Sequence, residues 1–177
     1  VHHSLIKRSS RFVIYDEEDA RRLIREAARE LKVEGSWEQF LSDIDRLKNH
    51  GMQPQDDLSC VLNRNDPESP YLKLLHRAYH LYEQKLARYD ALDFTDLLLK
   101  AIRMLEQHPE VLDRVRQRYL YILVDEYQDT CPLQERLLRL LSGPALNLCV
   151  VGDDDQAIYA FRHADVAAIL TFEARYP

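Results

Sequence analysis

The chain has 177 residues, of which 46% are hydrophobic and 31% are charged, and its formal net charge at pH 7 is −6. This balance is typical of a globular protein and excludes an intrinsically disordered chain. No apolar run reaches the roughly 18 residues that a membrane-spanning helix needs. The first residues also show no signal-peptide pattern. We therefore expect a cytoplasmic protein with no membrane partner. The net charge does not decide whether nucleic acid binds, because a local basic face is sufficient for phosphate contacts.

The three cysteines are far apart in the sequence, and no two of them form a C-x-x-C pair. This spacing argues against a zinc site and against a disulfide framework, and it fits a reducing compartment. We interpret Cys60, Cys131 and Cys149 as packing residues.

The first half of the chain has the periodicity of helices. Apolar residues recur at helical spacing in residues 16–32, where acidic residues in the first turn suit the helix dipole. A second helix is predicted to begin at Ser36, because Ser36-x-x-Gln39 has the form of a capping box, and to end at Gly51. Residues 52–69 are predicted to form a loop with one short helical turn.

Three more helices are predicted before the character of the chain changes. One covers residues 70–89, with Ser69 as its N-cap and Pro70 at its first position. The next covers residues 94–107, capped by Asp93, and a short one covers residues 109–118.

The second half of the chain alternates apolar runs with an amphipathic helix. Residues 119–124 and 146–151 are short apolar runs, and residues 132–141 between them have helical spacing. Strand, helix and strand in this order predict a βαβ unit in a parallel sheet that is covered on both faces, and hence an α/β fold. Such sheets carry their chemistry at the carboxyl ends of the strands.

Acidic residues stand at the predicted end of the first strand. An Asp at such a position can hold magnesium, usually through water, since this ion keeps part of its hydration shell. An adjacent Glu can orient and deprotonate an attacking water. Asp125 and Glu126 therefore predict a nucleoside-triphosphatase site, although a pair of solvated acids would look the same.

The predicted second strand is followed by polar and aromatic residues. Asp153–Asp155 form either a metal site or a solvated turn, and we favour the turn for Asp154. The amide of Gln156 is placed to contact a terminal phosphate. The residues that follow suit base stacking and phosphate contact, unless they are ordinary core residues; they are Tyr159, Phe161 and Arg162.

These segments resemble a known family. VDEYQDT (124–130) and VVGDDDQAIYAFRHAD (150–165) resemble motifs II and III of the UvrD/Rep family of superfamily-one DNA helicases. HSLIKR (3–8), FVIYDEEDARRLI (12–24) and LDFTDLL (92–98) resemble other segments of the family in the right order. The resemblance covers nearly the whole chain, and motifs II and III together are highly specific.

The resemblance implies a role for each matching residue and implies ATP and Mg²⁺ as cofactors. Asp125 would be the magnesium ligand, Glu126 the catalytic base and Gln156 the sensor of the γ-phosphate. Gln128 and Asp129 would support the nucleotide site. The implied DNA contacts are His3, Ser4, Tyr159, Phe161 and Arg162.

Two observations leave the implied DNA contacts open. His163 stands where the family usually has glycine, which changes the backbone freedom beside Arg162. The alternative that His2 and His3 are the remnant of a tag also remains.

The implied architecture is an incomplete RecA-like P-loop NTPase core with an all-helical accessory subdomain. Residues 1–9 would end the motif Ia region of core domain 1A, residues 10–90 would form helical subdomain 1B, and residues 91–177 would form part of core 1A. The implied function is that of an ATP-dependent 3′→5′ DNA helicase, which translocates on single-stranded DNA and unwinds duplexes. Its partners would be single-stranded DNA, duplex junctions and the remaining domains of the parent chain.

The sequence contains no G-x-x-x-x-G-K-[ST] loop and no second RecA-like half. Without that loop there is no cradle of amides for the phosphates. We therefore expect an excised or naturally truncated fragment that does not hydrolyse ATP appreciably by itself. Missing strands would leave an apolar sheet face exposed and favour dimerisation.

Two other readings are weighed against the helicase. The first is a catalytically silent module that binds nucleic acid or another protein. The second is a metal nuclease built on Asp125, Glu126 and Asp153.

Overall fold

The computed structural model describes residues 3–33, 37–62, 69–145, 147–156 and 167–176. The chain forms two compact units, residues 1–100 and residues 101–177. None of the helices in the described part of the chain combines the length and the apolar character that a bilayer crossing requires.

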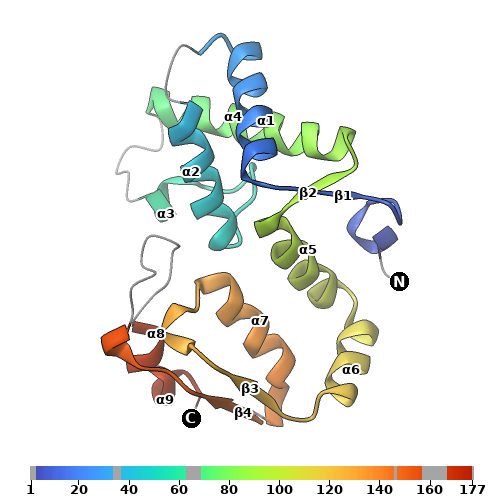
Figure 1. Cartoon of the computed structure of the whole chain (residues 1–177), viewed down its shortest axis with the longest axis vertical. Helices are drawn as coiled ribbons and strands as arrows, with labels where there is room; N and C mark the ends of the chain where they lie inside the picture. The colour runs from blue at the N-terminus through green and yellow to red at the C-terminus, as the bar shows by residue number, and fades with distance from the viewer. Residues whose placement is uncertain (1–2, 34–36, 63–68, 146, 157–166, 177) are drawn as a thin grey trace. The chain divides into compact units, whose positions relative to one another are not determined.

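The first unit is built mainly from helices, which follow a short 3₁₀ helix, η1 (His3–Ile6). They are α1 (Glu17–Glu30), α2 (Trp37–Asn49), α3 (Ser59–Leu62) and α4 (Pro70–Arg88), and α5 (Phe94–Gln107) begins in this unit (Figure 1). These bounds confirm the predicted helices to within a few residues. The proposed capping box at Ser36 lies outside the described residues.

Capping residues explain where several of these helices begin and end. The carboxylate of Asp16 accepts a hydrogen bond from the Asp19 backbone N–H, and the Ser69 hydroxyl accepts one from the Leu72 N–H. Such bonds satisfy amides that have no partner in the first turn. At the other end of α2, Gly51 adopts φ 76°, a conformation that glycine reaches without strain.

The core of the first unit lies between α1, α2 and α4. The apolar faces that the helical periodicity predicted are the faces that are buried. Side chains with at most 1% exposure include Ile24, Phe40, Ile44, Leu75 and Tyr82.

A short strand pair joins the two ends of the helical region. Strands β1 (Val13–Tyr15) and β2 (Ala91–Asp93) pair in parallel, with Val13 opposite Ala91 and Tyr15 opposite Asp93. This pair corrects the prediction that residues 10–90 are entirely helical. Three residues are too few to show the alternation by which a strand is recognised in sequence.

The second unit contains the predicted βαβ arrangement. After α6 (Pro109–Arg118), strand β3 (Ile122–Val124), helix α7 (Pro132–Ser142) and strand β4 (Leu148–Val150) follow in order. The strands are parallel and lie side by side, with Leu123 opposite Cys149 (Figure 1). The short helices around them are η2 (Tyr127–Asp129), η3 (Gly143–Ala145), η4 (Asp154–Gln156), α8 (Ala167–Leu170) and α9 (Phe172–Arg175).

Among the described residues, one side of this sheet has no covering element, which corrects the prediction that both faces are covered. Leu123 is 78% exposed, Tyr121 is 75% exposed and Val151 is 60% exposed. The side chains alternate across the strands, so Cys149 is also exposed next to Leu123. Cys60 is exposed too, and of the three cysteines only Cys131 is buried, so the packing interpretation is wrong for Cys60 and Cys149.

Candidate active site

A strained turn follows strand β3 and presents two carboxylates. Asp125 and Glu126 are both exposed, and Glu126 has left-handed backbone angles, φ 52° and ψ 41°. This conformation is unfavourable for a residue with a side chain, and it persists only where the surroundings impose it. The Glu126 backbone N–H donates to Asp125 Oδ1 over 2.9 Å.

Backbone bonds between the two strand ends hold this turn. The Val151 N–H donates to the Val124 carbonyl over 2.8 Å, and the Tyr127 N–H donates to the Val151 carbonyl over 3.0 Å. The turn after β3 and the segment after β4 are therefore fixed to each other.

The side chain of Gln128 connects the two strand ends. It is 1% exposed, its Nε2 donates to Glu126 Oε2 over 2.7 Å, and its Oε1 accepts from the Asp153 backbone N–H over 3.0 Å. Only one amide orientation satisfies both contacts, since the carboxylate can only accept and the backbone N–H can only donate.

Asp153 carries the connection on to Gln156. Its Oδ2 accepts from Gln156 Nε2 over 2.6 Å, and its Oδ1 accepts from the Asp155 backbone N–H over 3.1 Å. Glu126, Gln128, Asp153 and Gln156 thus form one continuous hydrogen-bonded chain, which we call the strand-end relay.

The relay depends on the absence of a side chain at Gly152. A Cβ atom at this position would lie 2.6 Å from Gln128 Oε1 and 2.8 Å from Ile169 Cδ1. Neither contact is possible without a shift, so a larger residue would push the Gln128 amide away from the Asp153 N–H.

Tyr127 anchors the turn on the opposite side. Its side chain is fully buried, and its hydroxyl donates to Glu135 Oε2 over 2.6 Å. Burial, together with the nearby Glu135 carboxylate, raises the pKa of Tyr127 well above its ordinary value. The Phe172 ring meets the Tyr127 ring edge-on, with centroids 5.4 Å apart.

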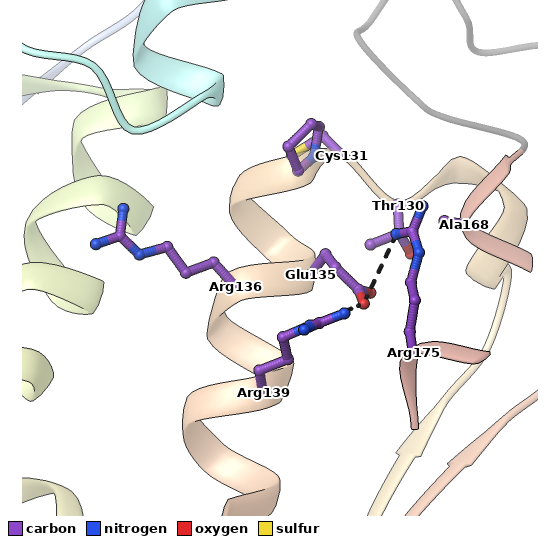
Figure 2. A pocket seen from close by; sticks show the side chains of 8 residues that line it. Thr130, Cys131, Glu135, Arg136, Arg139, Ala168 and Arg175 are labelled. Carbon is purple, nitrogen blue, oxygen red and sulfur yellow. Dashed lines mark ion pairs between the residues drawn. The ribbon is translucent and has the colours of Figure 1, made fainter. Parts of the chain in front are cut away.

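The other side of Glu135 faces a basic cavity of about 240 Å³. Arg139 and Arg175 point toward Glu135 and approach its Oε1 to 3.5 and 3.8 Å, whereas Arg136 extends away from it (Figure 2). The other residues that line the cavity are Thr130, Cys131, Pro132 and Ala168. The cavity contains none of the residues predicted to bind nucleotide.

Asp129 offers a further oxygen at this end of the sheet. Its Oδ1 is buried and has no hydrogen-bond partner among the described residues. Within the same part of the chain, no group of three or more His, Cys, Asp or Glu side chains is placed to hold a metal ion.

The structure brings together the nucleotide-site residues that the sequence pointed to. Asp125, Glu126, Gln128 and Asp129 follow β3, and the relay joins Glu126 and Gln128 to Gln156. The predicted DNA contacts Tyr159, Phe161 and Arg162, and also His163, lie outside the described residues.

The other predicted DNA contacts belong to the first unit. His3 and Ser4 lie on η1, where His3 Nδ1 is 3.1 Å from the Arg8 carbonyl oxygen and Ser4 is exposed. Arg8 in turn donates to the Ala91 carbonyl over 3.1 Å, which pins this segment to β2.

Sequence reasoning missed two members of the site. Asp153 was left open between a metal site and a solvated turn, with no predicted link to Gln128, and Tyr127 carried no predicted role. Their partners Gln128 and Glu135 are brought to them by strand pairing and helix packing, and no spacing in the sequence signals either contact.

A parallel strand pair with helices and with an acidic turn at its carboxyl edge is consistent with part of a RecA-like helicase domain. All 177 residues match the family model described as the UvrD/REP helicase N-terminal domain, and the chain therefore belongs to this family. The resemblance that motifs II and III indicated is thereby confirmed.

Two similar proteins are both called ATP-dependent DNA helicase PcrA. The one from Staphylococcus epidermidis (strain ATCC 12228) is 37% identical over 169 residues, and the one from Staphylococcus aureus (strain NCTC 8325) is 36% identical over 169 residues. Each alignment covers 94% of this chain but 22% of the relative, so the chain spans about a fifth of the length of these proteins.

Proposed function

We propose that the chain is the part of an ATP-dependent DNA helicase that handles magnesium and water at the ATPase site. The observation that carries this proposal is the strand-end relay, which ties a candidate base, Glu126, to a candidate phosphate sensor, Gln156. When a carboxylate and an amide are held at neighbouring strand ends, the carboxylate can act on the attacking water and the amide can contact the phosphate that is transferred.

The residues after β3 suit a magnesium ion. Asp125 would hold the ion and Asp129, with its unpartnered buried oxygen, would support it. Carboxylate oxygens are the ligands that magnesium prefers, and this ion commonly uses one or two of them together with water and phosphate. When bound, it would neutralise charge on the phosphates.

Glu126 would act as the general base and Gln156 as the sensor. Glu126 is exposed, and its Oε2 is oriented by Gln128, so its carboxylate can take a proton from water near the strand end. The Gln156 amide is also exposed, and its bond to Asp153 can be exchanged for a bond to a phosphate oxygen.

The helical part would be an insertion into the core. Strands β1 and β2, which precede and follow helices α1–α4, are paired with each other. The chain therefore enters and leaves the helical segment at adjacent positions. This supports the assignment of residues 10–90 to subdomain 1B and of residues 1–9 and 91–177 to core 1A.

The DNA side of the proposal rests on the family. Its substrate would be single-stranded DNA with a duplex junction, its direction 3′→5′, and its contacts His3, Ser4, Tyr159, Phe161 and Arg162. The remaining helicase domains would complete the ATP site. By itself the chain would not hydrolyse ATP, since its sequence has no G-x-x-x-x-G-K-[ST] loop.

A second candidate function is a catalytically silent module that binds nucleic acid or protein. The bare apolar face around Tyr121 and Leu123 favours it, because exposed apolar patches mark interaction sites. In the helicase proposal, helices of the rest of the core would cover the same face.

The two functions are separated by a Glu126→Gln variant of the intact protein. If Glu126 is the base, ATP hydrolysis falls by roughly 10²- to 10⁴-fold while ATP binding is retained, because the amide cannot take a proton. Glu173→Gln, an exposed glutamate on α9, is the matched control and should hydrolyse ATP normally. Near-normal hydrolysis by Glu126→Gln would overturn the assignment of the base.

A further inference from the structure

We propose that Gln128 is a positioning residue that sets the placement of both Glu126 and Gln156 without contacting the nucleotide. The proposal rests on the function proposed above. It assigns to one buried amide the task of holding two reactive side chains that come from different strand ends.

The hydrogen-bonding capacity of Gln128 is directed at the protein. Its side chain is 1% exposed, Nε2 faces the Glu126 carboxylate, and Oε1 faces the Asp153 backbone N–H. An amide that is buried and engaged at both ends is not available to a bound nucleotide. Loss of the Gln128 amide would remove the acceptor that the Asp153 backbone N–H uses.

Glu126 needs such a partner because little else in the described part of the chain holds it. It is exposed, and an exposed glutamate side chain is free to rotate. The Gln128 N–H is a donor to a charged acceptor, which makes the bond short and strong. Because this bond engages Oε2, it orients Oε1 as the atom that takes the proton, and such orientation contributes to rate.

Asp153 extends the same control to Gln156. Its backbone N–H is fixed by Gln128 Oε1, and its carboxylate binds the Gln156 amide. The separation between Glu126 and Gln156 is therefore set through Gln128. Gly152 permits this arrangement, since any side chain there would collide with Gln128 Oε1.

Two substitutions at Gln128 separate its two contacts. Gln128→Glu keeps an oxygen for the Asp153 N–H but places a second carboxylate against Glu126. Gln128→Met has a similar volume and removes both contacts. Gln134→Glu, which adds the same charge at an exposed position on α7, is the matched control.

Kinetics of the intact protein test the catalytic consequence. We expect both Gln128 variants to lower kcat for ATP hydrolysis by roughly 10- to 100-fold, with KM for ATP changed much less, because an orienting partner is lost and no substrate contact is lost. We expect the Gln134→Glu control to match the wild type. A rise in KM with kcat unchanged would show that Gln128 binds nucleotide, and would overturn the proposal.

Hydrogen exchange in the 177-residue chain tests the geometry without any ATPase activity. The Asp153 backbone amide should be protected in the wild type and in Gln128→Glu, and its protection should be lost in Gln128→Met. In a double variant, Glu126→Gln with Gln128→Glu, the new amide at position 126 can donate to the new carboxylate at position 128. The double variant should therefore be thermally more stable than Gln128→Glu alone, but it should not regain ATP hydrolysis.

The outcomes distinguish the two levels of the proposal. An active wild-type enzyme with unchanged kcat in both Gln128 variants overturns the positioning role alone. An intact wild-type protein that hydrolyses no ATP overturns the proposed function, whatever the exchange pattern shows. Unaltered Asp153 protection in Gln128→Met overturns the relay itself.

Discussion

Lys48 Nζ lies 2.7 Å from Asp93 Oδ2, although the two residues are 45 positions apart in the sequence. Glu83 and Asp96 also approach the same ammonium group, at 2.6 and 3.0 Å. Burial acts to lower the pKa of Lys48, but the surrounding carboxylates outweigh it and hold this pKa well above the ordinary value. The buried charge cluster of Lys48, Glu83, Asp93 and Asp96 therefore joins α2, α4, β2 and α5.

The Lys48→Met variant should be strongly destabilised. The side chain is 1% exposed, and its removal leaves carboxylates close together without their shared cation. We expect the free energy of unfolding in urea to fall by about 3–5 kcal/mol. Arg21→Met, which breaks an exposed pair on α1, is the control and should lose less than about 1 kcal/mol. Equal losses in the two variants would contradict the role of the cluster.

The stability of the first unit should fall in acid through Glu83. Burial opposes the charged form, but Lys48 and then Lys100 outweigh it and lower the pKa of Glu83 from 4.5 to about 2. A lowered carboxyl pKa gives stability that is present above pH 4.5 and is lost as the pH falls toward 2.

A Glu83→Gln variant isolates this contribution. It should be roughly 2–3 kcal/mol less stable than the wild type at pH 7, and the difference should shrink as the pH falls from about 4.5 to about 2. Asp96 contributes with the opposite sign, because burial raises its pKa. The measurement is urea unfolding of the wild type and of Glu83→Gln across this pH range. A difference in unfolding free energy that does not change with pH would contradict the lowered pKa of Glu83.

Gly152→Ala should disturb the strand-end relay. The new methyl group would lie 2.6 Å from Gln128 Oε1, so the amide or the segment after β4 must move. We expect a loss of about 1–3 kcal/mol in unfolding free energy, as for overpacked sites. Asp154→Ala, an exposed neighbour, should change stability by no more than about 0.5 kcal/mol. If both variants unfold alike, the close approach at Gly152 is wrong.

Tyr127→Phe should destabilise the second unit by about 1–3 kcal/mol, because the Glu135 carboxylate then loses a buried donor. A Glu135→Gln change should couple to it, since the two side chains share one hydrogen bond. A double-mutant cycle by thermal unfolding measures this coupling. If the losses of unfolding free energy in the two single variants simply add in the double variant, the Tyr127–Glu135 hydrogen bond contributes no coupling energy.

Helices were the part of the fold that could be predicted from the sequence. Ser69 and Asp93 cap the helices predicted from them, because capping depends on residues only three positions apart. Strands β1 and β2 were missed because the pairing of Val13 with Ala91 is not local and each strand has three residues.

The candidate site was only half visible in the sequence. Asp125, Glu126 and Gln156 stand in the motifs, so their place at the strand ends could be predicted. The relay through Gln128 could not, because it depends on how far the turn after β3 reaches toward Asp153. Nothing in the sequence signals the burial of Lys48, because its carboxylate partners come from three other elements.

The most direct test of the helicase proposal is strand displacement by the intact protein on a duplex with a single-stranded 3′ tail. We predict unwinding that requires ATP and magnesium, that is absent with Glu126→Gln, and that is much weaker on a duplex with a 5′ tail. The 177-residue chain alone should displace no strand. Intact wild-type protein that binds the tailed DNA but displaces no strand from it with ATP would contradict the proposal and favour a silent binding module.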